Sequence, residues 1–309
     1  MAVERVAEAP ELMRPEVESP RKVLWFFKIC FSLITKKPLG ALGGFLIVLL
    51  VGTAIFAPFL APYDPIQISS ASRLKPPSQA HPFGTDDFGR DILSRIIYGA
   101  RISMYVGLGA VSISSFLAVS IGMISGFYGG KIDTFIQRCV DTLMAFPGLV
   151  ILLTIMAMLG QGLGNVILAL AIGGTAGNSR IIRSAVLAIK ENQYIEAARA
   201  TGCPNWLILL RYILPNVAAP IIVIATLGLG AAILAESALS FLGFGVPPPA
   251  PSWGGMLSGS GRTYMLKAPW MAIFPGIAIS LAVFGFNMLG DALRDLLDPK
   301  LRGGPQGRL

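Results

Sequence analysis

The chain has 309 residues, of which 54% are hydrophobic and 14% are charged, and its mean hydropathy is +0.68. Soluble globular domains carry about 25% charged residues, so this composition excludes an ordinary soluble protein and favours a membrane protein. The net charge of +8 is therefore interpreted through the positions of the charged residues relative to the membrane.

Five long uncharged runs predict membrane-spanning helices. A hydrocarbon core about 30 Å thick needs about 20 apolar residues per helical crossing. Four runs have the length for one crossing each. The longest, with 38 residues, has the length for two, separated by the turn-favouring segment 160–165. Because backbone groups in lipid must be paired within the segment, we expect an all-α membrane protein with six transmembrane helices. The runs are 41–61, 102–130, 142–179, 212–235 and 268–290.

The distribution of positive charge indicates how these spans are oriented. Six crossings place both ends of the chain on one side of the membrane. With the amino end inside, 18 of the 25 Lys and Arg residues lie on the inner side and 7 on the outer side. Cytoplasmic loops carry this excess, so we expect both termini in the cytoplasm. The net charge follows from topology and predicts no nucleic-acid partner.

The amino-terminal region does not resemble a secretory signal, because its first twenty residues carry five glutamates and two arginines. Aromatic residues alternate with lysines over 21–38, which favours a helix lying on the inner leaflet, although a simple extension of the first span fits equally well. The expected organisation is a disordered cytoplasmic tail (1–20), the interfacial helix (21–38), a first span (39–62), an extracytoplasmic loop with a short helix (63–101), a core of five spans (102–303) containing a cytoplasmic loop (187–215), and a cytoplasmic tail (304–309).

The sequence lacks the residues that nucleotide binding, metal binding and catalysis require. No lysine is followed by Ser or Thr, so there is no phosphate-binding loop of the Walker A type. His81 is the only histidine, and no Cys/His cluster has metal-ligand spacing. We therefore expect no catalytic residue, no metal and no bound cofactor. The three cysteines lie on the inner side or its interface, which predicts no extracytoplasmic disulfide. The glycines at 160, 162, 164, 228 and 230 are expected to allow close approach of helices.

The cytoplasmic loop carries an unusual local pattern. Residues 191–200 mix polar and small side chains without a wide apolar stripe, which predicts a short helix whose alanines permit close contact with another protein. Gly202 suits a left-handed cap at the end of that helix, and a second helix begins at Asn205. Pro215 lies near the start of the fifth span, where its missing backbone donor is tolerated. The spacing alone favours a solvated helical hairpin that joins two spans.

The same loop resembles the "EAA" loop of the membrane-spanning subunits of ABC importers. The resemblance rests on Glu196-Ala197-Ala198, the glycine six residues after Glu196, and Leu214-Pro215. In that family the loop docks on an ATPase subunit. Glu196 and Arg199 lie three residues apart and are expected to pair on one face of the helix. The implied ATPase-coupling residues are Tyr194, Glu196, Ala197, Ala198, Arg199, Ala200, Gly202, Leu214 and Pro215.

Two further segments, on the outer side, are similar to the "C" permease subunit of the dipeptide/oligopeptide/nickel branch of this family. They are residues 81–95 and 236–254, and matches extend from about residue 35 to 303. Thr85 or Asp86 is expected to cap the short helix of the outer loop. The implied gate or binding-protein contacts are Thr85, Asp86, Gly89, Arg90, Asp91, Glu236 and Trp253. A helix that merely packs on the bundle, and a solvated glutamate at a helix end, remain the structural alternatives.

The resemblance implies a permease subunit with the type I ABC importer fold in a bacterial or archaeal cytoplasmic membrane. Such a subunit forms half of a path for di- or oligopeptides or related small solutes. Its implied partners are a homologous permease, two ATP-binding subunits that use ATP and Mg, an extracytoplasmic solute-binding protein and the lipid bilayer. A self-contained transporter is the main alternative, but the uncharged runs leave few groups for ion coupling. A membrane enzyme is disfavoured by the missing catalytic groups.

Overall fold

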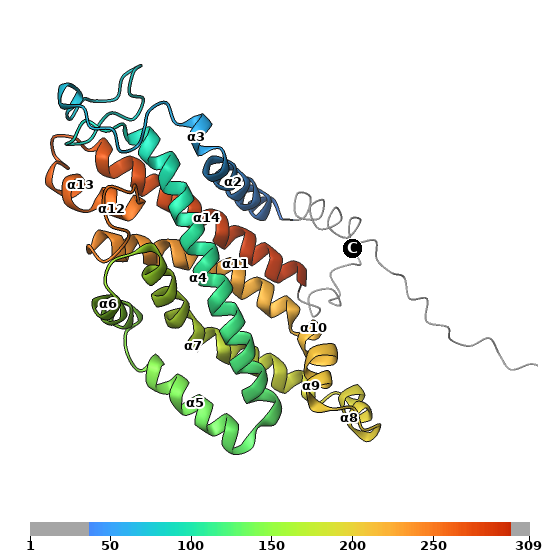
Figure 1. Ribbon diagram of the computed structural model, residues 1–309. Helices are drawn as coiled ribbons and strands as arrows, with labels where there is room; N and C mark the ends of the chain where they lie inside the picture. The colour runs from blue at the N-terminus through green and yellow to red at the C-terminus, as the bar shows by residue number, and fades with distance from the viewer. Residues whose placement is uncertain (1–36, 298–309) are drawn as a thin grey trace, which may run out of the picture.

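A computed structural model describes residues 37–297, and within this range the chain is helical, without a β-strand (Figure 1). Predictions for residues 1–36 and 298–309, including both tails and most of the interfacial helix, lie outside the described residues. The helices are α2 (Pro38–Ile55), α3 (Ala57–Leu60), α4 (Ile92–Tyr128), α5 (Gly130–Met144), α6 (Gly148–Leu159), α7 (Leu163–Lys190), α8 (Gln193–Ala200), α9 (Asn205–Ile208), α10 (Leu214–Asn216), α11 (Ala218–Phe241), α12 (Trp253–Leu257), α13 (Gly259–Thr263) and α14 (Trp270–Leu297), with a 3₁₀ turn at Ser70–Ser72 and a π-helical turn at Leu209–Ile213.

Four described helices are long and apolar enough to cross a membrane: α2, α4, α11 and α14. The pair α5 and α6 passes the same test together but is bent by 89°. The longest uncharged run breaks in the expected place, since α6 ends at Leu159 and the next residue, Gly160, has a φ of +79°. However, α6 has 12 residues and is about 18 Å long, which is shorter than the hydrocarbon core. The described part of the chain thus contains four such helices, or five if the bent pair is one span.

The outer loop differs from the prediction of a separate short helix. Asp91 accepts a hydrogen bond from the Ser94 amide, and the helix that it caps runs without interruption to Tyr128. The prediction that Thr85 or Asp86 caps a short helix was therefore wrong. The reason is that no proline separates the outer apolar turns from the span and Gly99 is accommodated within the helix, so one helix includes both.

Three long-helix interfaces hold the bundle together: α4 against α7, α11 against α14, and α14 against α2. At the first of these, a Cβ added to Gly122 would lie 2.7 Å from the backbone oxygen of Ser179. Gly230 shows the predicted close approach of helices, because a Cβ added there would lie 3.3 Å from the Cβ of Phe286. Gly160 and Gly164 have no neighbour within 4 Å of an added Cβ, so their predicted role in helix contact was wrong.

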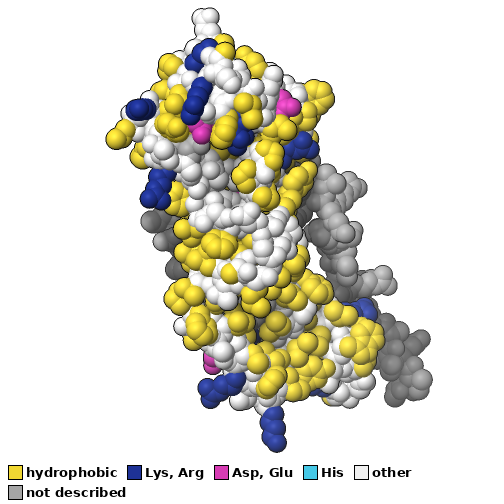
Figure 2. Space-filling model, turned by 60° about the vertical axis from the view of Figure 1, so that its left-hand side comes forward, with side chains coloured by type: hydrophobic (Ala, Val, Ile, Leu, Met, Phe, Trp, Pro, Cys, Tyr) yellow, Lys and Arg dark blue, Asp and Glu magenta, His cyan; other side chains and the backbone are white. Residues whose placement is uncertain are grey.

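The two described ends of the chain lie at the same end of the bundle. Lys37, just before α2, forms an ion pair with Asp295 in the last turns of α14, with 2.6 Å between Nζ and Oδ2. At the other end, residues 61–91 and 251–269 form a cap that contains α12 and α13 (Figure 1). Charged side chains gather at the two ends and leave an uncharged band between them (Figure 2). This distribution suits a membrane-spanning bundle.

Candidate coupling loop and cap

The predicted coupling helix is α8, and hydrogen bonds fix the turn that follows it. The Gly202 amide donates to the Arg199 carbonyl, and the Cys203 amide donates to the Ala198 carbonyl. These two bonds form a Schellman motif, which requires a left-handed residue after the helix. Gly202 has a φ of +78°, as the prediction of a glycine cap requires. The loop after α7 is therefore a rigid helix–turn–helix, with α9 beginning at Asn205.

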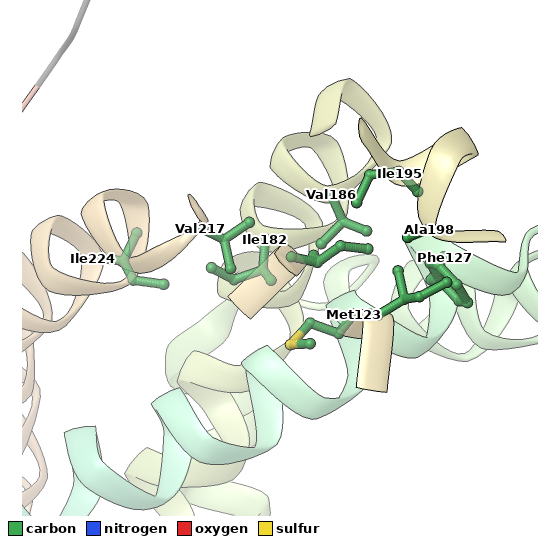
Figure 3. Close-up of a cluster of buried hydrophobic side chains, with 10 residues drawn as sticks. Met123, Phe127, Ile182, Val186, Ile195, Ala198, Val217 and Ile224 are labelled. Atoms are coloured by element: carbon green, nitrogen blue, oxygen red, sulfur yellow. The ribbon is translucent and has the colours of Figure 1, made fainter. Parts of the chain in front are cut away.

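A buried apolar cluster anchors α8 to the bundle (Figure 3). Ile195 is fully buried and Ala198 nearly so, and both belong to the same cluster as Phe127 of α4. The guanidinium of Arg199 lies over the Phe127 ring, 5.1 Å from its centroid. The predicted Glu196–Arg199 ion pair is absent from the described ion pairs, because Arg199 lies on the ring of α4 instead. The other cluster members are Met123, Ile182, Val186, Ile208, Ile213, Val217 and Ile224.

The opposite face of α8 is exposed and mixes alanines with larger polar side chains. Among the predicted coupling residues, Ala198 is buried and Leu214 is half-buried, whereas the remaining seven are exposed: Tyr194, Glu196, Ala197, Arg199, Ala200, Gly202 and Pro215. Two large apolar side chains beside them are exposed as well, Trp206 (61%) and Leu210. A groove of about 400 Å³ lies where the loop meets the ends of α4 and α7, lined by Phe127, Tyr128, Lys190, Glu191, Glu196, Arg199 and Asn205. The loop therefore presents a surface with room for another protein.

Within the cap, Asp86 organises a tight turn. Its carboxylate accepts hydrogen bonds from the amides of Phe88 and Arg90, each at 2.9 Å, and from Arg90 Nε at 2.6 Å. Gly89 has a φ of +75°, and any Cβ there would collide with the Ser69 carbonyl. Asp86 is buried and Arg90 half-buried. These residues shape the loop from inside, and Phe88 is the exposed side chain that the turn presents.

Asp91 and Thr85 link the loop to the helices. The Asp91 carboxylate caps α4 and lies 3.0 Å from Nδ1 of His81. Thr85 is fully buried, and its carbonyl accepts a hydrogen bond from the Trp270 indole at the start of α14. Both predicted site residues are therefore structural links inside the cap.

Trp253 and Glu236 are buried where the cap meets the spans. The Trp253 indole donates to the Ile96 carbonyl at 3.0 Å, and its ring lies 2.6 Å from the Cβ position of Gly99. Glu236 is 0% exposed and accepts a hydrogen bond from Ser240 Oγ at 2.6 Å. The alternative of a solvated glutamate at a helix end is wrong, because α11 places this carboxyl inside the protein.

An ion-pair cluster between α5 and α7 was not among the predicted sites. Arg183 donates to both carboxylate oxygens of Asp133, at 2.6 and 2.5 Å, and Ser125 of α4 bonds the same carboxylate. Arg180 and Asp141 pair nearby at the surface. Val140 is the one buried residue of α5, so these ion pairs are prominent among the contacts that hold α5 against the bundle. The sequence signal was the glycine pair followed by Asp133, whose partner lies fifty residues away.

Comparison with known proteins identifies the fold and the family. A family model described as binding-protein-dependent transport system inner membrane component matches residues 118–303, which is more than half of the chain. The chain belongs to this family. A second model, the N-terminal TM domain of oligopeptide transport permease C, matches residues 31–77 of this permease. The permease is thus a multi-pass protein of the inner membrane, of the DppC/OppC-like type.

Individual relatives agree along nearly the whole chain. The dipeptide transport system permease protein DppC of Alkalihalophilus pseudofirmus is 44% identical over 303 residues, covering 96% of this chain and 99% of the relative. The glutathione transport system permease protein GsiD of Pectobacterium atrosepticum is 39% identical over 298 residues, covering 96% and 97%. A solved chain of the MetNI methionine ABC transporter, in inward-facing conformations, has a TM-score of 0.55 and 16% identity, covering 66% of this permease and 96% of that chain. That likeness shows the type I importer fold.

Proposed function

We propose that this permease forms half of the translocation path of an ATP-driven importer for di- or oligopeptides or related small solutes. The names of two relatives that match along nearly their whole length support this substrate class. One is named as a dipeptide permease and the other as a glutathione permease. The exposed face of α8 is the observation that supports coupling. A helix that passes movement from an ATP-binding subunit to the bundle must be rigid and must be accessible to that subunit. Its Schellman turn and buried anchor supply the rigidity.

The proposed topology has six crossings and both termini in the cytoplasm. The bent pair α5–α6 and the more polar α7 supply the two crossings beyond the four long apolar helices. The ion pair between Lys37 and Asp295 supports termini on one side, since it joins the residue before α2 to the last turns of α14. The excess of positive charge assigns that side to the cytoplasm. The cap then faces outward.

The proposed assembly contains a homologous permease, two ATP-binding subunits and an extracytoplasmic solute-binding protein. ATP and Mg act in the ATP-binding subunits, and this permease contributes no catalytic group and no cofactor. On the outer side, buried residues such as Asp86 and Thr85 position the cap, and its exposed apolar side chains are available to the binding protein. These are Ile66, Ile68, Phe88, Met265 and Leu266.

Coupling requires that the ATP-binding pair interact differently with the two arrangements of the permeases, because a partner that binds both equally shifts nothing. In the proposed mechanism, ATP binding closes the pair of ATP-binding subunits and draws the two coupling loops together. The anchor of α8 passes that movement to α4 through Phe127 and to α7 through Val186. The bundles then tilt toward the outward-facing arrangement.

A substitution at Gly202 tests this mechanism. The left-handed conformation there costs a β-branched residue about 1–2 kcal/mol, while asparagine adopts it more readily. No atom lies within 4 Å of an added Cβ, so the effect comes from the backbone alone. In proteoliposomes with the complete transporter, Gly202→Val is expected to insert normally but to lose ATP-dependent uptake, and Gly202→Asn to retain it. Unchanged uptake by Gly202→Val would argue strongly against coupling through α8.

A further inference from the structure

A cavity of about 280 Å³ lies among α4, α6, α7 and α11, within the region that carries the membrane spans. Its wall is unusually small and uncharged: glycines 148, 173, 174 and 228 and alanines 110, 231, 232 and 235 supply most of it. At about 30 Å³ for each water in the liquid, the space corresponds to roughly nine waters. The volume is at the lower end of the range for small-ligand sites.

Two polar side chains in this wall lack hydrogen-bond partners. Ser114 of α4 is 95% buried, and its Oγ has no partner among the described residues. The hydroxyl faces α7, where a Cβ on Gly174 would lie 2.9 Å away. The structure assigns no side-chain hydrogen bond to Asn178 within the described range either. Asn178 is half-buried, whereas the Ser114 hydroxyl is buried without a partner in that range, which is destabilising, so the cavity wall retains unmet hydrogen-bonding capacity.

Ser103, Ser114 and Ser115 of α4 all have buried hydroxyls without a partner in the described part of the chain, and Ser114 is the one of the three that lines the cavity. Hydroxyls in transmembrane helices ordinarily bond a carbonyl one turn back in their own helix. Thr175 does so with Ala171 at 2.7 Å, and Ser179 bonds Ala176 at 2.7 Å. Ser114 does not, although it lies on a regular helix. Its hydroxyl therefore remains free for a group inside the cavity.

We infer that this cavity is a solute site that binds the uncharged amide backbone of a short peptide during passage. The Asn178 amide offers both a donor and an acceptor, as the peptide group does, and the Ser114 hydroxyl also offers both. No charged side chain lines the cavity, so it does not select a carboxylate or an ammonium group. The glycine and alanine wall sets the size limit. This inference rests on the proposed function and names the chemical feature that the path recognises.

The test uses the complete transporter in proteoliposomes, with labelled dialanine and labelled glutathione as probes, and measures uptake per ATP hydrolysed. Ser114→Ala combined with Asn178→Leu is expected to lower this ratio for the probe that wild type accumulates, by about fivefold for each neutral hydrogen bond that is lost. Ser114→Ala alone should leave the unfolding temperature unchanged or raised, because its hydroxyl has no partner. Discrimination against the N-methylated analogue of the same probe should fall in the double variant.

Two matched controls separate the site from general damage. Gly148→Leu fills open space at the cavity wall and should block uptake, whereas Gly276→Leu fills open space on α14 and should not. Thr226→Val removes a hydroxyl of α11 that bonds its own helix, and it should also leave uptake unchanged. Wild-type uptake in the Ser114→Ala, Asn178→Leu variant overturns the inference while leaving the proposed function intact. Failure of wild type to accumulate either probe with ATP overturns the proposed function, and the inference falls with it.

Discussion

The guanidinium of Arg199 stacks over the ring of Phe127, which joins the proposed coupling helix to the last turn of α4. The two residues are more than seventy positions apart in sequence, and the contact spans the boundary between the exposed loop and the membrane-spanning bundle. In the proposed mechanism, movement of α8 reaches α4 through this ring, which is itself part of the buried cluster.

Replacing the Phe127 ring is expected to loosen coupling. Phe127→Leu retains much of the apolar volume but removes the surface on which Arg199 lies, a contact of about 0.5–1 kcal/mol when exposed. We expect less solute transported per ATP hydrolysed, with normal membrane insertion. Phe116→Leu, the same change at an exposed site of α4, is the control and should behave as wild type. Equal transport ratios in both variants would contradict the role of the ring.

The ion pair between Asp133 and Arg183 is expected to stabilise the position of α5. Asp133→Asn should lower stability by about 1–3 kcal/mol, because Arg183 loses a bidentate charged partner in a half-buried site. Asp141→Asn breaks the exposed pair between the same helices and should cost less than about 1 kcal/mol. Thermal unfolding in detergent measures both. If the two substitutions lower stability by the same amount, the Asp133–Arg183 pair contributes no more to stability than the exposed pair does.

Close contact between α4 and α7 is expected to depend on Gly122. Gly122→Ala places a Cβ 2.7 Å from the Ser179 carbonyl and should destabilise the protein by about 1–3 kcal/mol. Gly177→Ala on α7 meets no atom within 4 Å and should leave stability unchanged or raise it by about 0.5–1 kcal/mol. Unfolding temperatures of the two variants provide the comparison. A stable Gly122→Ala protein would show that the helices can separate without cost.

Removal of the Asp91 cap is expected to release the start of α4. Asp91→Ala should cost about 1 kcal/mol, because the Ser94 amide loses its acceptor. Asp91→Asn keeps a side-chain oxygen for the cap but loses the carboxylate that faces His81, so its cost should be smaller. Hydrogen exchange of the first turn of α4 reports the effect locally. Unaltered protection in Asp91→Ala would mean that burial alone holds this turn.

Local signals in the sequence predicted the coupling loop well. The boundaries of α8, the left-handed Gly202 and the start of α9 at Asn205 all depend on residues within a few positions of one another. The turn after α6 is of the same kind, because its glycines adopt positive φ where the uncharged run was expected to break. Such features are encoded by short-range backbone preferences, which a sequence displays directly.

Features that depend on distant contacts were missed. Nothing near Glu236 indicates that α11 buries it, and nothing near Asp91 excludes Thr85 or Asp86 as the cap. The pairing of Asp133 with Arg183 likewise arises from a tertiary contact across fifty residues, whereas the bend between α5 and α6 falls at Pro147, a local helix breaker. Run length alone therefore predicted six spans, whereas four described helices have the length and composition for one, or five with the bent pair.

The central claim is that this permease works as one subunit of an ATP-driven importer. Gentle purification from its native membrane, followed by mass spectrometry of the proteins that accompany it, tests this claim most directly. We expect a second multi-span permease and one or two kinds of ATP-binding subunit in the purified complex. In the Gly202→Val variant, the ATP-binding subunits are expected either to be lost or to remain bound without coupled transport. A pure subunit without any ATP-binding protein, under conditions that preserve known importer complexes, would contradict the account and favour a transporter that works alone.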